Sequence, residues 1–159
     1  MRLPLSALLL ISLTTAPVAS LAAQAPPPAV SDSIMVPIRA MFRGMYAHDS
    51  AMVRSAFVPG AQFSRPPRPG RPHAFTSVDQ FVAAVGRPGE PWDEQIYNIK
   101  IQEDAGMAAV WTFFRFSLGT KFSHCGVNAF LVVRTGEGWK ISGLADSNRT
   151  TDCDVPSGG

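Results

Sequence analysis

Residues 107–118 read Met-Ala-Ala-Val-Trp-Thr-Phe-Phe-Arg-Phe-Ser-Leu, residues 122–134 read Phe-Ser-His-Cys-Gly-Val-Asn-Ala-Phe-Leu-Val-Val-Arg, and residues 139–149 read Trp-Lys-Ile-Ser-Gly-Leu-Ala-Asp-Ser-Asn-Arg. All three stretches are rich in Val, Ile, Phe, Trp and Thr, and turns that contain glycine separate them. This composition is typical of β-strands joined by hairpins. The sequence therefore predicts three consecutive antiparallel strands, each long enough to bend around something.

Three helices are predicted before these strands. Apolar residues recur at helical spacing after capping residues over 34–46 and 52–57. Ser77, with Gln80 three residues later, forms a capping box that opens the third helix. We expect Pro37 to be tolerated because it lies in the first turn of its helix.

The remaining elements fix the fold class. Residues 92–104 alternate loosely between apolar and polar side chains and predict one more long strand, and residues 61–64 predict a short one. Residues 65–73 hold four prolines and predict a loop in which Arg65 is solvated. Helices first and long strands last are typical of an α+β fold. We expect three N-terminal helices packed on a strongly curved antiparallel sheet, with a ligand pocket at the mouth of the cone.

The N-terminal end has the pattern of a secretory signal peptide. Arg2 precedes an apolar run, residues 3–13, which is too short to span a bilayer, and small residues follow it. The alternative is an uncleaved membrane anchor. We therefore expect a secreted or periplasmic protein that is free of the membrane after cleavage. The expected organisation is a signal peptide at 1–23, a linker at 24–30, one domain at 31–153 and a disordered tail at 154–159.

The chain has two cysteines, Cys125 and Cys153. An exported protein reaches an oxidising compartment, where such a pair usually forms a disulfide. A bridge across a loop of about 28 residues stabilises a fold by roughly 3 kcal/mol when chain entropy is the only contribution. We expect the bridge, and the alternative is two free thiols.

Charge and motifs exclude several classes of function. The formal net charge of +2 gives no electrostatic basis for binding nucleic acid or an acidic membrane. The three histidines, His48, His73 and His124, do not have the spacing of metal ligands. The sequence contains no nucleophile elbow, phosphate loop or dinucleotide fingerprint. We therefore expect neither a metal nor a cofactor.

Three segments resemble a known superfamily. They are residues 124–130 with Val133-Arg134-Thr135 after them, the Gly138-Trp139-Lys140-Ile141 turn and strand, and Leu144-Ala145-Asp146-Ser147 with Arg149 and Cys153 after it. The chain resembles the nuclear transport factor 2-like superfamily, which has a cystatin-like cone, and is most similar to its SnoaL-like and lumazine-binding group. The superfamily includes isomerases, dehydratases, cyclases, binding proteins and transport factors, so the resemblance implies a fold more than an activity. The resemblance to the ketosteroid isomerases of this superfamily implies a tyrosine and an aspartate in the pocket. The candidates in this sequence are Tyr46 and Asp146.

Strand alternation predicts which residues face the pocket. Apolar and polar residues alternate at the start of the last strand, so the face that carries Trp139 should point at the helices. The hairpin transfers this face to His124 and Asn128 and leaves Asp146 outside. A β-bulge at Gly143 would bring Asp146 inside instead, and both registers stay open.

The strand over 107–118 offers further candidates. Arg115 is the one charged residue in an apolar run, and it could anchor an anion or a carbonyl group. The alternative is an ion pair with Asp93 or Glu94 across the sheet. Both faces of this strand are apolar, which is compatible with a homodimer through the sheet. The expected ligand-binding residues are Trp111, Arg115, Asn128, Phe113 and Trp92.

Two functions remain open. The first is a binding domain whose apolar cone pocket takes a small apolar or carbonyl-bearing ligand. The second is a cofactor-independent isomerase, cyclase or dehydratase in which His124, Asp146 and Tyr46 supply acid–base groups. His124 suits a general base because the reference pKa of histidine is about 6.5. The alternative is a rim or core histidine that is bonded to the C-terminal tail. A buried carboxyl group that faces another titratable group would favour the enzyme.

Overall fold

The structure is a computed structural model that describes residues 28–67, 70 and 72–155. The predicted signal peptide, most of the linker and the last four residues lie outside the described residues. Within the described part, no helix is both long enough and apolar enough to cross a membrane.

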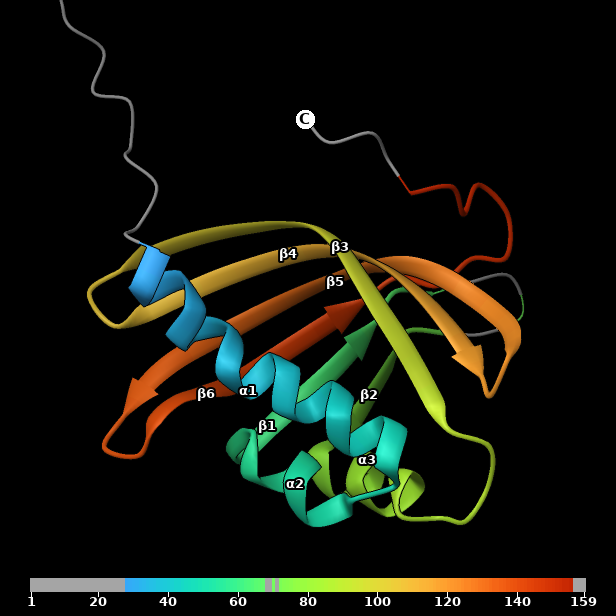
Figure 1. Ribbon diagram of the computed structural model, residues 1–159, viewed down its shortest axis with the longest axis horizontal. Helices are drawn as coiled ribbons and strands as arrows, with labels where there is room; N and C mark the ends of the chain where they lie inside the picture. Colours follow the sequence, from blue (N-terminus) through green and yellow to red (C-terminus); the bar gives the residue numbers. More distant parts are fainter. Residues whose placement is uncertain (1–27, 68–69, 71, 156–159) are drawn as a thin grey trace, which may run out of the picture.

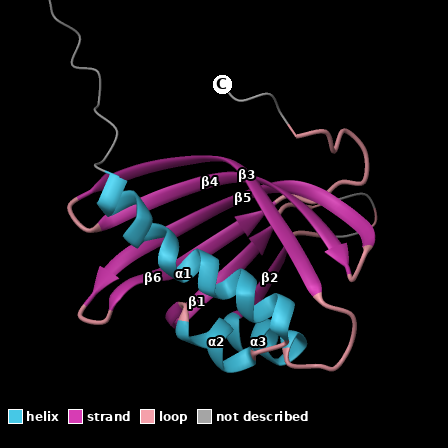
Figure 2. Cartoon of the chain, in the orientation of Figure 1, coloured by secondary structure: helices cyan, strands magenta, loops and turns pink. Residues whose placement is uncertain are grey.

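Three helices and a six-stranded sheet make up the fold (Figure 1). The sheet order is β2-β1-β6-β5-β4-β3, and the helices lie against one of its faces (Figure 2). The helices are α1 (Pro28–Ala47), α2 (Ser50–Ser55) and α3 (Val78–Val85). The strands are β1 (Phe57–Arg65), β2 (Ala74–Ser77), β3 (Trp92–Asp104), β4 (Met107–Leu118), β5 (Lys121–Thr135) and β6 (Gly138–Asp146).

The four long strands and the α+β class agree with the sequence prediction, but the sheet is mixed rather than antiparallel. β1 lies parallel to β6, whereas every other strand pair is antiparallel. No hairpin joins β1 to β6, so turn geometry does not fix their relative direction. Strand β1 also begins at Phe57, which we assigned to the second helix, and β2 was not predicted at all. Two strands therefore separate α3 from the other two helices.

Helix α1 is longer than its pattern indicated. It begins at Pro28, so Pro37 lies in the helix interior and not in its first turn. Proline has no N–H group, so the carbonyl group of Ser33 lacks its usual donor four residues later. Buried residues on both sides of this position, Ile34 and Ile38, hold the helix against the sheet. Tertiary packing therefore compensates for the lost hydrogen bond.

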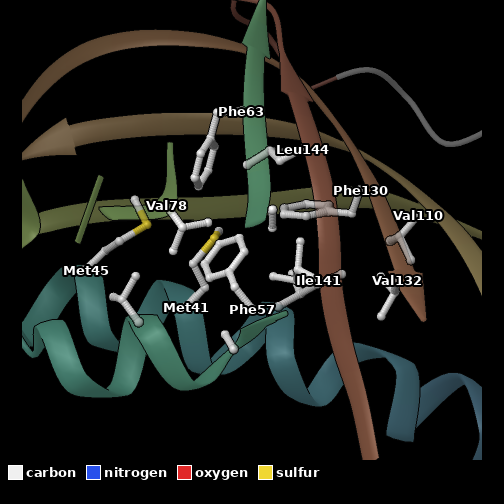
Figure 3. Close-up of a cluster of buried hydrophobic side chains, with 14 of the residues drawn as sticks. Met41, Met45, Phe57, Phe63, Val78, Val110, Phe130, Val132, Ile141 and Leu144 are labelled. Atoms are coloured by element: carbon white, nitrogen blue, oxygen red, sulfur yellow. The ribbon is translucent and has the colours of Figure 1, made fainter. Parts of the chain in front are cut away.

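The hydrophobic core fills the space between the helices and the inner face of the sheet (Figure 3). Met41 of α1, Phe130 of β5 and Ile141 of β6 are each at most 2% exposed. The opposite face of the sheet is more open, because Trp111 and Leu131 are 54% and 53% exposed. The helices therefore define an inner face, which is covered, and an outer face, which is partly bare.

A β-bulge in β6 decides which residues reach the inner face. Val132 pairs with Ile141, but the preceding Leu131 pairs with Gly143, so Ser142 is an extra residue. In a regular strand, residues three apart lie on opposite faces. Here Ile141 and Leu144 both belong to the core, which the extra residue makes possible. Asp146, two residues after Leu144, is turned inward by the same bulge.

The predicted disulfide between Cys125 and Cys153 is confirmed, with a Cα–Cα distance of 5.6 Å. It ties the segment after β6 to β5, and Cys125 and Arg149 exchange two backbone hydrogen bonds of 2.9 Å. Gly126 lies under this segment, where a Cβ atom would collide with the backbone oxygen of Ser147. The close approach of the two backbones therefore requires glycine at this position.

Candidate functional site

A cavity of about 290 Å³ lies between the helices and the inner face of the sheet. All strands except β2 contribute to its wall, together with α1 and α3. Most of the wall is apolar, and its polar side chains are gathered on four strands. The lining residues are Met41, Met45, Phe63, Arg65, Phe81, Trp92, Glu94, Phe116, Leu118, His124, Asn128, Leu144 and Asp146.

The first polar element of the wall is an ion pair between Arg65 and Asp146. Arg65 is the last residue of β1 and Asp146 the last of β6, and these two strands lie side by side. Arg65 Nε donates to both carboxylate oxygens of Asp146, at 2.7 and 2.9 Å. The Asp146 side chain is only 8% exposed, whereas that of Arg65 is 49% exposed. The pair therefore places a buried anion beside a cation that still reaches the solvent.

The second polar element is a hydrogen bond between Asn128 and Glu94. Asn128 Nδ2 of β5 donates to Glu94 Oε1 of β3 at 2.7 Å. Asn128 is buried, and Glu94 is partly buried in the cavity wall. Strand β4 lies between β3 and β5, so the two side chains meet over the inner face of β4.

The surroundings of Glu94 raise the pKa of its carboxyl group from 4.5 to about 7. Removal from water is the main cause, because burial penalises the charged form. The hydrogen bond from Asn128 lowers the pKa, the negative charge of Asp146 raises it, and the positive charge of Arg65 lowers it. The pKa of Glu94 therefore lies near neutral pH, where the group can either accept or donate a proton.

Four of the residues singled out in the sequence line this cavity: Trp92, His124, Asn128 and Asp146. His124 contacts the ring of Phe116 at a centroid distance of 4.8 Å, and its Nδ1 lies 3.0 Å from Ser123 Oγ. The register without a bulge placed Asp146 on the outer face of the sheet, which is wrong. The alternative with a bulge is the observed one, although the extra residue is Ser142 and not Gly143.

The other expected site residues lie elsewhere. In β4, Thr112 pairs with Asn128 and Phe116 with His124, so even-numbered residues face the cavity and odd-numbered residues face away. The placement of Trp111, Phe113 and Arg115 on the pocket side is therefore wrong. Tyr46 is 57% exposed and is not part of the cavity wall.

Arg115 has a structural partner in place of a ligand. Its Nη1 donates to the backbone oxygen of Cys153, and its guanidinium group lies 4.8 Å from the centre of the Phe122 ring. The alternative ion pair with Asp93 or Glu94 is also not observed among the described residues. Arg115 therefore helps to hold the segment that carries the disulfide.

Sequence reasoning missed Glu94 and Arg65 as site residues. Glu94 follows Trp92 by two positions, so both side chains lie on one face of β3. A carboxyl group on the face that carries Trp92 and Ile96 was the available signal. Arg65 was assigned to a solvated loop because of the prolines that follow it, but it ends β1 and contacts Asp146.

The described residues contain no cluster of three or more His, Cys, Asp or Glu side chains arranged to hold a metal ion. The side chains of the cavity wall offer proton transfer, hydrogen bonding and charge stabilisation. Glu94 and His124 are the titratable groups of the wall that do not belong to its ion pair.

No family model and no curated protein matches the sequence. Solved structures are similar, however. A Shewanella baltica NTF2-like protein of unknown function shares 10% identity over 80% of this chain and 100% of its own, with a TM-score of 0.64. An NTF2-like protein with a cystatin-like fold from Novosphingobium aromaticivorans shares 9% identity over 79% of this chain and 85% of its own, with a TM-score of 0.65. At these identities the likeness concerns architecture alone: the chain has the α+β fold of NTF2-like proteins.

Proposed function

We propose that the cavity binds a small, largely apolar molecule and that Glu94 transfers a proton to or from it. One observation carries this proposal: a carboxyl group with its pKa raised to about 7 lines a largely apolar cavity. A general acid or base works best when its pKa lies near the working pH. Strongly shifted carboxyl groups in apolar cavities also occur preferentially at functional sites.

The contacts of Glu94 suggest how the step would proceed. Oε1 accepts the hydrogen bond from Asn128, which leaves Oε2 without a hydrogen-bond partner among the described residues. Oε2 is therefore the oxygen that would take a proton from the ligand or return one to it. Asn128 would act as a positioning residue, because its amide fixes the carboxyl group. His124 lines the same wall and is the candidate second proton carrier.

Three expectations from the sequence remain part of this proposal. The first is that a strongly curved sheet forms a cone around the cavity. The lining residues support it, because they come from five consecutive strands of the sheet, from β1 to the edge strand β3. The second is the relationship to SnoaL-like proteins. The third is export to a secreted or periplasmic location, which the disulfide supports because such bridges persist in oxidising compartments.

A second candidate function is ligand binding without chemistry. Most lining residues are apolar, among them Met41, Met45 and Phe63, and such walls suit the retention of a hydrophobic molecule. In that case Glu94 would only orient the ligand. The two functions differ in whether a bound molecule exchanges a proton with Glu94.

A generic proton-transfer probe separates them. Nitrobenzisoxazole loses its ring C–H proton to a base, its N–O bond breaks, and a cyanophenolate that absorbs visible light is released. We expect the wild-type protein to accelerate this opening, with a rate that rises as Glu94 ionises around pH 7. Glu94→Gln should lower the acceleration by about a hundredfold. Asp93→Asn, on the opposite face of β3, is the matched control. A rate equal in wild type and Glu94→Gln would leave only the binding function.

A further inference from the structure

Arg65 uses only part of its hydrogen-bonding capacity. A guanidinium group has five N–H donors, one on Nε and four on the two terminal nitrogens. Nε is occupied by Asp146, but neither Nη1 nor Nη2 donates to an acceptor among the described residues. Arg65 nevertheless lines the cavity, and its side chain is 49% exposed. The terminal donors are therefore available to a ligand.

The charge balance of the wall limits what that ligand can be. Arginine often binds carboxylates, because two parallel N–H groups match two oxygens. In this cavity the positive charge is already balanced by Asp146, and Glu94 contributes further negative charge when it ionises. A carboxylate would thus lose its hydration and meet a wall with no net positive charge, which is unfavourable. A neutral acceptor oxygen can use the Arg65 donors without this cost.

We propose that Arg65 is the specificity-determining residue of the cavity and that its terminal N–H groups bind a neutral carbonyl oxygen. The apolar body of the ligand packs against Met41, Met45, Phe63 and Phe81, and ligands that carry a carboxylate are excluded. The inference rests on the proposed function in one respect only, that the cavity binds a ligand. It requires no chemistry at Glu94.

Three compounds with the same ring test the inference: naphthalene, acetylnaphthalene and naphthoate, titrated into the wild-type protein by calorimetry near pH 8. We expect the ketone to bind most tightly and the carboxylate to bind at least about tenfold more weakly than the ketone. Arg65→Lys keeps a positive charge beside Asp146 but loses the fork of donors. It should weaken ketone binding about tenfold and leave naphthalene binding unchanged.

Naphthalene binding shows that the cavity of the variant is intact, so a folding defect cannot imitate the expected result. Equal ketone affinity in wild type and Arg65→Lys would overturn the inference, and so would tighter binding of naphthoate than of acetylnaphthalene. Binding of none of the three compounds would overturn both the inference and the proposed function. Glu94→Gln distinguishes the two: the preference for the ketone should persist in this variant even if no proton transfer is detected in wild type.

Discussion

The cavity wall has two ends, and each holds one carboxyl group in a different environment. At the β1–β6 end, Asp146 is nearly buried and is held by two contacts from a cation, Arg65. At the β3 end, Glu94 is less buried but has only an amide donor, and its pKa rises to about 7. In this wall the partner of a carboxyl group therefore matters as much as its depth of burial. One end of the wall holds its carboxyl group in an ion pair, whereas the other end leaves a carboxyl group that can exchange a proton near neutral pH.

Loss of the Arg65–Asp146 ion pair, at the β1–β6 end of the wall, should have the largest effect on stability. Arg65→Met leaves the buried carboxylate of Asp146 without a cation and should lower the free energy of unfolding by about 3 kcal/mol at neutral pH. Asp146→Asn should cost less, about 1 kcal/mol, because the remaining Arg65 is half exposed and can be hydrated. Urea unfolding of both variants measures the difference.

The exposed ion pair between Arg54 and Asp79 provides the matched control. Its side chains are 53% and 80% exposed, so Arg54→Met should change the free energy of unfolding by less than about 0.5 kcal/mol. If Arg65→Met and Arg54→Met cost the same, the contrast between the two ends of the wall would be lost.

The effect of Glu94, at the β3 end of the wall, on stability should depend on pH. The pKa of Glu94 is higher in the folded protein than the value of 4.5 expected for the unfolded chain, so the folded state binds more protons between these values. Stability is therefore lost as the pH rises from about 4.5 to about 7. Glu94→Gln removes this cost and should raise the free energy of unfolding by about 2 kcal/mol near pH 8.

Near pH 4 the same substitution should have almost no effect, because Glu94 is then mostly protonated in both states. Gln also keeps an oxygen that can accept the hydrogen bond from Asn128. The comparison of wild type and variant by chemical denaturation at the two pH values isolates this one group. An equal gain at both would contradict the raised pKa.

Two substitutions should move the pKa of Glu94 in opposite directions. Asn128→Leu removes the donor that favours the ionised form, so the pKa should rise above about 7. Asp146→Asn removes a negative charge and leaves that of Arg65 unbalanced, so the pKa should fall. Carbon-13 NMR of the glutamate carboxyl groups follows the titration directly. Shifts of the same sign in both variants would show that the charges and the amide do not act as assigned.

The smallest effect is expected from an arginine on the other face of the sheet. Arg115→Ala should change the affinity for acetylnaphthalene by less than about twofold, because Arg115 contacts the C-terminal segment and not the cavity. Calorimetric titration beside Arg65→Lys makes the comparison direct. A large loss of affinity in Arg115→Ala would show instead that Arg115 contributes to ligand binding.

Capping and strand composition were sufficient to predict the fold class. Ser77 and Gln80 form the capping box, and each of the four long strands lies within three residues of its expected bounds. The parallel contact of β1 with β6 could not be predicted, because no local signal links strands that are so far apart in the sequence. The inner face of β4 was also missed: both of its faces are apolar, so alternation does not distinguish them.

The candidate site was predicted only in part, for a related reason. His124 and Asn128 followed from alternation at the start of β6 and from the hairpin that joins it to β5, and both signals are local. The contacts Arg65–Asp146 and Glu94–Asn128 join residues 81 and 34 positions apart, and the register of several strands decides them. A pKa raised by burial likewise depends on groups from different strands, so the residue type alone does not reveal it.

Because of the bulge at Ser142, the site depends on the number of residues in β6 as well as on its side chains. Deletion of this one residue would restore strict alternation in β6 and would turn Leu144 and Asp146 to the outer face. Arg65 would then lose its carboxylate although no charged residue had been replaced. In a lineage of such chains, the insertion or deletion of a single codon at this position would therefore create or abolish the ion pair of the cavity wall in one step, with Arg65 and Asp146 both retained.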